Sequence, residues 1–181
     1  MSAEDSTGRL FLEESIATFR GQKALAERAV AQVADDDLHV ALDENTNSIA
    51  VIMQHIAGNL LSRWTDFLTS DGEKPWRGRD GEFVDDGKSR DTLFERWEKG
   101  WARLFETTAG LTEADLAKTI TIRGHKQTVL SAVERAIAHF GYHIGQIVIL
   151  ARHLAGDAWE TLSIPRGPGE SERYDRRVWK K

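Results

Sequence analysis

Residues 128–156, TVLSAVERAIAHFGYHIGQIVILARHLAG, carry a long amphipathic pattern that decides the fold class. Apolar residues recur every three or four positions, which is the period of an α-helix with one buried face. They include Val129, Val133, Phe140 and Ile147. Gly156 follows as a suitable C-terminal glycine. The pattern predicts a helix over residues 128–154 that buries one side against other helices.

Three further segments show the same period, and they cover residues 7–33, 48–68 and 92–107. Polar residues that can cap a helix precede two of them, with Asn45 to Ser48 before the second segment and Asp91 before the third. Trp97 and Trp101 lie on one face of the third segment, so we expect both in the core. Four amphipathic helices predict an all-α fold, a four-helix bundle.

The connections between these helices differ in character. Residues 70–90 combine five residues of Gly and Pro with many charges and predict a long irregular crossover, a type of loop that is often functional. Residues 118–129 show two short polar and apolar runs around Arg123-Gly124-His125, which favour a short hairpin. The tail, residues 156–181, has no clean period, and we expect it to lie over the bundle or to be partly mobile, with Trp179 at the surface or in a contact.

The composition bounds the function. At 181 residues, with 40% hydrophobic and 29% charged residues, we expect one domain over residues 1–181. The net charge of -5 gives no basic surface for nucleic acid. An acidic N-terminus and short apolar runs argue against secretion and against a membrane span. We therefore expect a cytoplasmic protein. The absence of cysteine excludes disulfides and any thiol supplied by the chain itself.

Three histidines lie in apolar surroundings on predicted helices. His139 and His143 are four residues apart, so they share a helix face and can share a ligand. Two neutral imidazoles one turn apart are a known way to hold zinc. A hydrogen-bonded core histidine is the alternative, and it is the favoured interpretation for His55 taken alone. Sequence spacing does not place His55 opposite the other two.

Several motifs of this chain resemble the DinB/YfiT-like superfamily of metal-dependent four-helix bundles, which has one His on its second helix and His-x3-His on its fourth. His55, His139 and His143 match that pattern. Further motifs, which match a DinB-like subfamily, are Asn47-Ser48-Ile49, His55-Ile56-Ala57-Gly58-Asn59-Leu60, Gly72-Glu73-Lys74, Arg79-Asp80-Gly81-Glu82-Phe83 and Leu162-Ser163-Ile164-Pro165-Arg166-Gly167. The resemblance covers nearly the whole chain. It implies a divalent metal site at the three histidines and a homodimer.

Three neutral imidazoles leave a metal ion at least one open position, which is typical of catalytic sites. Zn or Ni is the expected metal, and imidazole alone does not choose between them. The resemblance also implies that a low-molecular-weight thiol can serve as cosubstrate. We expect an enzyme of the hydrolase or thiol-transferase type that acts on a small molecule. A non-catalytic metal or ligand module and a structural dimer remain alternatives.

Other residues near the histidines in sequence are candidates for supporting roles. Asn59, Arg63, Tyr142 and Gln146 are candidates for orienting the ligands or lining a pocket, with ordinary packing or ion pairing as the alternative. In the crossover, Arg79, Asp80 and Glu82 are candidates for a polar lid, and a salt-bridge cluster is the alternative. Gly58, Gly141 and Gly145 interrupt two helices and predict close packing at those points.

Overall fold

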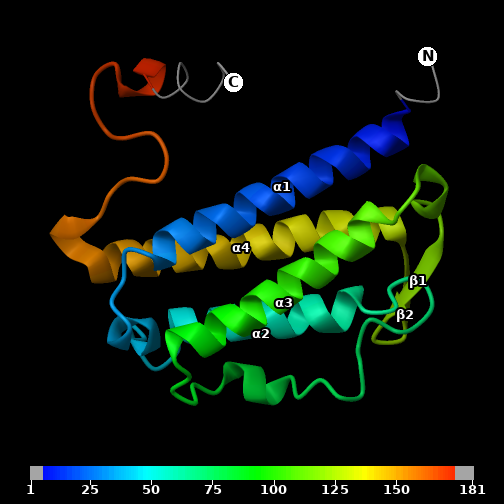
Figure 1. Cartoon of the computed structure of the whole chain (residues 1–181), viewed down its shortest axis with the longest axis horizontal. Helices are drawn as coiled ribbons and strands as arrows, with labels where there is room; N and C mark the ends of the chain where they lie inside the picture. Colours follow the sequence, from blue (N-terminus) through cyan, green and yellow to red (C-terminus); the bar gives the residue numbers. More distant parts are fainter. Residues whose placement is uncertain (1–5, 174–181) are drawn as a thin grey trace.

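The computed structural model describes residues 6–173 and consists of four long helices and one hairpin (Figure 1). The main elements are α1 (Thr7–Val30), α2 (Ile49–Trp64), α3 (Arg90–Ala109), β1 (Thr119–Ile122), β2 (His125–Thr128) and α4 (Val129–Ala155). Short 3-10 turns are η2 (Asp36–His39), η3 (Asp80–Phe83), η4 (Glu113–Asp115) and η5 (Gly156–Ala158). The predicted four-helix bundle, with its crossover and hairpin, is confirmed. No helix in this described part of the chain is long and apolar enough to span a membrane.

The helices pack in two main pairs. α1 lies mainly against α4, α2 lies mainly against α3, and α2 also contacts α4 and η3 (Figure 1). Because neighbours cover α2 on several sides, nearly all of its residues are buried, including His55. Aromatic side chains no more than 2% exposed fill the centre, and they are Phe19, Trp64, Trp97, Trp101 and Phe140. The core positions predicted for Trp97 and Trp101 are therefore confirmed.

Each long helix begins behind a Ser or Thr whose side chain accepts a hydrogen bond from a backbone amide of the first turn. These caps are Ser6, Ser48, Ser89 and Thr128. The cap of α3 is Ser89, whose hydroxyl accepts from the amide of Thr92 at 3.3 Å, and not Asp91. Asp91 instead lies in the first turn, where a negative charge suits the helix dipole.

The first two helices end earlier than predicted. α1 stops at Val30, and α2 stops at Trp64 because Thr65 is extended and Asp66 takes a positive φ of 49°. Val33 and Phe67 are nevertheless buried. The apolar period thus continues past both helix ends, so periodicity alone does not reveal the change in backbone direction.

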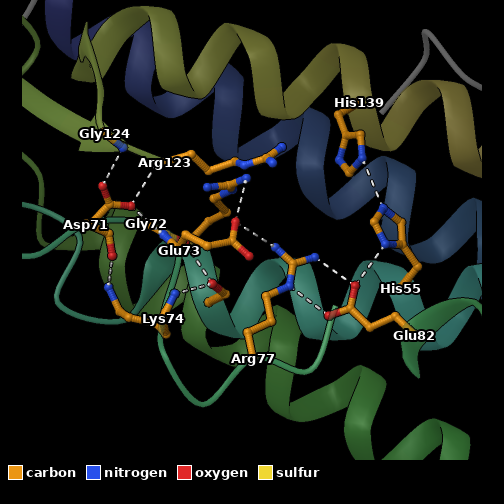
Figure 2. Close-up of polar contacts among 12 residues, drawn as sticks. His55, Asp71, Gly72, Glu73, Lys74, Arg77, Glu82, Arg123, Gly124 and His139 are labelled. Carbon is orange, nitrogen blue, oxygen red and sulfur yellow. Dashed lines mark hydrogen bonds and ion pairs between the residues drawn. The ribbon is translucent and has the colours of Figure 1, made fainter. Parts of the chain in front are cut away.

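The hairpin has a two-residue turn. Ile122 pairs with His125, and the intervening Arg123 and Gly124 both have positive φ, at 55° and 75°, as in the tight turns that match strand twist. The carboxylate of Asp71 accepts hydrogen bonds from the amides of Arg123 and Gly124 at 2.8 and 2.9 Å. This contact fixes the turn against the start of the crossover (Figure 2).

The beginning of the tail contacts Gln32, just after the end of α1. The amide of Glu160 donates to the side-chain oxygen of Gln32 at 2.7 Å, and the Gln32 amide donates back to the Glu160 carbonyl at 3.1 Å. Trp179 and the rest of the tail beyond residue 173 lie outside the described residues.

Candidate metal centre

Three imidazoles from two helices converge between α2 and α4. His55 lies on α2, and His139 and His143 lie one turn apart on α4. One ligand nitrogen from each ring can be chosen so that all three lie within 4.8 Å of one another. His55 is buried, and the other two are partly buried. The group could therefore hold a metal ion.

The ring orientation of His55 is set from behind by Glu82. The Nδ1 atom of His55 lies 3.0 Å from Oε2 of Glu82. Arg77 donates to the same carboxylate through two nitrogens, at 2.7 and 2.8 Å (Figure 2). An ionised carboxylate can only accept hydrogen bonds, so Nδ1 carries the proton. The Nε2 lone pair of His55 then points toward the other two histidines, as in the carboxylate–histidine–metal arrangement.

The charge of Glu82 follows from its partners. Burial raises the pKa of the Glu82 carboxyl, but hydrogen bonds from Arg77 and His55 outweigh burial and leave the pKa below its ordinary value. The side chain is 6% exposed, and the side chain of Arg77 is 2% exposed. A buried carboxylate with both oxygens bound is a fixed acceptor, which gives His55 little freedom to turn.

His143 has a different support. Its Nδ1 lies 2.8 Å from the side-chain oxygen of Gln146, and the Gln146 amide donates to the hydroxyl of Tyr142 at 3.2 Å. The amide oxygen accepts the Nδ1 proton, so Nε2 of His143 is also left as a free lone pair. Gln146 thus contacts His143 directly, and Tyr142 contacts Gln146.

The environment keeps the imidazoles of His139 and His143 neutral. Burial lowers the pKa of His139 to about 3, and the neighbouring His143 and His55 add to this effect. Burial also lowers the pKa of His143, although Gln146 opposes the shift. Neutral imidazole is the form that binds metal, so these two histidines need little deprotonation to act as ligands near pH 7.

The spacing of the nitrogens fits a metal. Nε2 of His55 and Nε2 of His139 are 3.4 Å apart. In a tetrahedral zinc site with bonds of about 2.0–2.1 Å, two ligand nitrogens lie roughly 3.3–3.4 Å apart. Two unprotonated nitrogens facing each other at this distance repel unless a proton or a cation lies between them. The donor set and its geometry therefore fit a divalent ion.

The polypeptide around Glu82 is shaped to admit its carboxylate. Gln54, directly before His55, donates its side-chain amide to the carbonyls of Gly81 and Val84 at 3.0 and 3.3 Å, which holds η3 against α2. Gly58 faces Glu82, and a β-carbon there would lie 2.1 Å from Oε1. Gly58 thus makes room for Glu82. A β-carbon at Gly145 would meet nothing within 4 Å, so Gly145 lacks the close packing predicted for it.

A cavity of about 210 Å³ lies beside the histidines. His55 and His139 belong to its wall, and His143 does not. The other lining residues are Asn59, Arg63, Trp64 and Phe67, then Arg77, Arg79, Ile122 and Arg123, and Ala132, Arg135 and Ala136. On α2 and α4 these residues recur at helical spacing, so the cavity runs from the histidines along the groove between the two helices toward the hairpin.

The remaining sequence candidates divide into two groups. Asn59, Arg63 and Arg79 line the cavity, and Arg63 also pairs with Glu73 at 3.4 Å. Asp80 is exposed and lies outside the cavity wall, so the structure does not bring it into a lid with Arg79 and Glu82. Glu82 instead contacts Nδ1 of His55 and holds its ring in place.

Sequence reasoning missed four residues at this site. Arg135 precedes His139 by four residues, so the spacing that linked His139 to His143 could have found it. Arg77, Arg123 and Gln54 gave no comparable signal. Arg77 and Arg123 lie in an irregular crossover and a turn, where no periodicity says which way a side chain points, and Gln54 is one of many polar residues on a helix.

The fold is similar to a solved structure from Bacillus subtilis. That protein, YfiT, is described as a probable metal-dependent hydrolase with an unusual four-helix bundle topology. The two structures align with a TM-score of 0.66 at 18% sequence identity, over 88% of this chain and 91% of YfiT. The predicted resemblance to the DinB/YfiT-like superfamily is confirmed at the level of the fold.

Comparisons of the sequence itself give two further results. A search of curated proteins finds no match. The model of the family described as "Protein of unknown function (DUF1572)" matches residues 6–168. The chain therefore belongs to the DUF1572 family.

Proposed function

We propose that this protein is a metal-dependent enzyme in which His55, His139 and His143 hold one divalent ion beside a substrate cavity. The observation that carries the proposal is the convergence of the three imidazoles within 4.8 Å. Two of the three have their Nδ1 atoms bound to side-chain oxygens, at 3.0 Å for His55 and 2.8 Å for His143. Such support is expected of ligands that act together.

The cavity favours an enzyme over a purely structural site. A structural zinc site is closed by four protein ligands, whereas a catalytic site has three and leaves a position for water or substrate. Here the described residues supply three imidazoles, and two of them face a cavity of about 210 Å³. A small molecule in that cavity would lie next to the ion.

A bound ion of this kind would lower the pKa of water or of an exogenous thiol and so supply a nucleophile near neutral pH. The protein itself would orient the imidazole ligands and exclude water from part of the substrate. Glu82 and Gln146 fix two of the imidazoles. Trp64, Phe67 and Ile122 give the cavity an apolar side that holds part of a substrate away from water. The chain contains no cysteine, so a thiol would come from the cosubstrate.

The test combines metal analysis with a reaction screen. Protein purified without added metal is assayed for metal content and then loaded with zinc or nickel, the two metals we propose. Each form is screened with small esters and alkylating electrophiles, in water alone and with a low-molecular-weight thiol. Metal-dependent turnover in water supports a hydrolase, and turnover that also needs thiol supports a transferase.

A matched pair of variants makes the screen specific. His143→Ala removes a proposed ligand, and His153→Ala removes an exposed histidine from the same helix. We expect turnover to fall to background in the first variant and to stay at the wild-type level in the second. Bound metal without turnover in any arm would favour the second candidate, a non-catalytic metal-binding module.

We also propose a cytoplasmic homodimer that acts on a small molecule and binds no nucleic acid. Tyr142 and Ile149 support the dimer because they lie two turns apart on the outer face of α4, with side chains 64% and 59% exposed. Large apolar side chains grouped on one helix face are typical of subunit contacts. Sedimentation of the wild type and of Ile149→Glu tests the dimer.

A further inference from the structure

The cavity beside the histidines carries a concentration of positive charge. Five of its lining residues are arginines from four different parts of the chain. They are Arg63 on α2, Arg77 and Arg79 in the crossover, Arg123 in the hairpin turn and Arg135 on α4. No carboxylate lines the cavity within the described part of the chain. A protein with a net charge of -5 has thus gathered cations on one small surface.

Only part of this charge is compensated. Glu82 accepts two hydrogen bonds from Arg77, and Glu73 pairs with Arg63 at 3.4 Å and with Arg77 at 3.8 Å (Figure 2). Arg79, Arg123 and Arg135 have no ion pair with any carboxylate of residues 6–173. The five guanidinium groups of the cavity are therefore paired with only two carboxylates, those of Glu73 and Glu82.

The neighbouring acid Asp71 offsets only part of this charge, through an electrostatic interaction with Arg63. Its carboxylate accepts hydrogen bonds from three backbone amides, those of Glu73, Arg123 and Gly124. It is used to hold the crossover to the hairpin turn. The excess of positive charge in the cavity remains.

The arginines also retain unused donors. Nη1 of Arg63 and Nη1 of Arg77 are buried and have no hydrogen-bond partner among the described residues. The Arg77 side chain is 2% exposed and the Arg63 side chain 14% exposed. Neither Nη1 atom is open to solvent, so an anion that enters the cavity would contact the exposed part of the Arg63 side chain. Burial, together with the charges of Arg77, Arg135 and Arg79, lowers the pKa of Arg63 to about 10, although Glu73 opposes the shift.

We propose that the cavity binds the anionic group, carboxylate or phosphate, of the enzyme's substrate, with Arg63 as the inner contact and Arg135 and Arg123 at the mouth. As an assignment of substrate class this rests on the proposed function, but the anion contact itself does not require the metal. Guanidinium groups suit both anions because their paired donors match two oxygens at once.

The helix geometry gives the distance between the bound anion and the histidines, where the other end of the substrate would react. Arg135 lies four residues from His139 on α4, and Arg63 lies eight residues from His55 on α2. With a rise of 1.5 Å per residue these separations are about 6 and 12 Å. The cavity of about 210 Å³ is smaller than most small-molecule pockets, which span roughly 300–1,000 Å³. The substrate is therefore small, with its anionic group one to two helical turns from the histidines.

Apolar residues fill the remaining wall. Trp64, Phe67, Ile122, Ala132 and Ala136 lie among the arginines. They favour an anion attached to a short apolar body over a free inorganic ion. Phenyl phosphate and benzoate are suitable probes, benzyl alcohol is the uncharged control, and inorganic phosphate tests whether the apolar body contributes.

The experiment is a calorimetric titration of each probe into the full chain at fixed ionic strength, first after metal removal by chelation and then with zinc. Metal-free protein is used first because a carboxylate or phosphate can also bind zinc directly. We expect phenyl phosphate, benzoate or both to bind, and which of them binds names the anion. Binding of benzyl alcohol with equal affinity, or no binding of either anion, would overturn the inference.

Three variants locate the contact. Arg135→Gln changes an exposed residue and Arg63→Gln a partly buried one, and circular dichroism checks that each folds. Arg103→Gln makes the same charge change on α3, outside the cavity, where Arg103 pairs with Glu106. We expect probe affinity to fall about tenfold in each cavity variant and to be unchanged in Arg103→Gln. Equal losses in Arg135→Gln and Arg103→Gln would show a diffuse charge effect and contradict the inference.

A separate zinc titration distinguishes the two proposals. If zinc fails to bind but the cavity variants lose probe affinity, the metal proposal is wrong and the anion site stands. If zinc binds at the histidines and neither anion binds, the anion inference alone is wrong.

Discussion

Oε1 of Glu82 lies so close to Gly58 that a β-carbon on residue 58 would be 2.1 Å from it. The two residues are in different elements, η3 and α2, and their contact places the carboxylate against the helix that carries His55. The glycine is therefore part of the histidine's support, because it makes room for the carboxylate that His55 contacts.

Gly58→Ala tests this relationship. The added methyl group displaces the Glu82 carboxylate, so His55 loses its acceptor and Arg77 its main partner. Loss of a supporting contact of this kind typically weakens metal affinity about 10- to 100-fold. The measurement is zinc affinity by competition with a chromophoric chelator. Unchanged affinity in a folded Gly58→Ala protein would show that the placement of Glu82 is unimportant.

Glu82→Gln tests the charge of the same group while nearly preserving its shape. Both oxygens of Glu82 accept hydrogen bonds from Arg77, and Oε2 also accepts from His55. An amide puts a donor at one of these positions, so Arg77 faces another donor in either orientation, and His55 does so as well when the donor replaces Oε2. We expect zinc affinity to fall about 10- to 100-fold. Glu73→Gln, which alters a partner of Arg77 that does not contact His55, should retain most of the affinity.

Gln146→Ala removes the acceptor of the His143 Nδ1 proton, which lies 2.8 Å away in the wild type. His143 is then free to rotate and to change tautomer, and we expect weaker zinc binding with little change in unfolding temperature, because Gln146 is only partly buried. Nuclear magnetic resonance of the imidazole nitrogens should show one His143 tautomer in the wild type and a mixture in the variant. A single unchanged tautomer would assign the orientation of His143 to another cause.

Two glycine substitutions separate helix packing from helix propensity. A β-carbon at Gly100 would lie 3.1 Å from Cβ of Leu60 and 3.2 Å from Cα of Ala57, where α3 crosses α2. Gly100→Ala should therefore lower the free energy of unfolding by about 1–3 kcal/mol through overpacking. Gly145→Ala meets nothing within 4 Å and should raise it by up to about 1 kcal/mol. Denaturation in urea measures both, and equal signs would contradict the packing described at Gly100.

The sequence predicted those parts of the fold that are marked by a periodic apolar pattern or by turn residues. Four amphipathic segments predicted the helices, and the turn at Arg123-Gly124 predicted the hairpin. The ends of α1 and α2 could not be placed because Val33 and Phe67 continue the apolar pattern after the helices stop. At the start of α3, Ser89 and Asp91 were both chemically able to cap, and only the structure shows that Ser89 does.

The site was only partly accessible from sequence for a related reason. Helix spacing joined His139 to His143, and the family resemblance added His55. The partners of these histidines come from segments without a period. Glu82 was placed in the predicted lid, but nothing in the crossover indicated that Gln54 and Gly58 draw it onto His55. Of the five cavity arginines, the sequence singled out Arg63 and Arg79, whereas Arg77 and Arg123 lie in a loop and a turn where no period indicates the direction of a side chain.

The most direct test of the central claim is X-ray absorption spectroscopy of the zinc-loaded protein. We predict one zinc per chain, with three imidazoles and at least one further oxygen at about 2.0–2.1 Å. His55→Ala and His139→Ala should each remove one imidazole from the spectrum or abolish binding. A zinc environment with carboxylate oxygens in place of imidazoles, or one unaltered by either variant, would contradict the account.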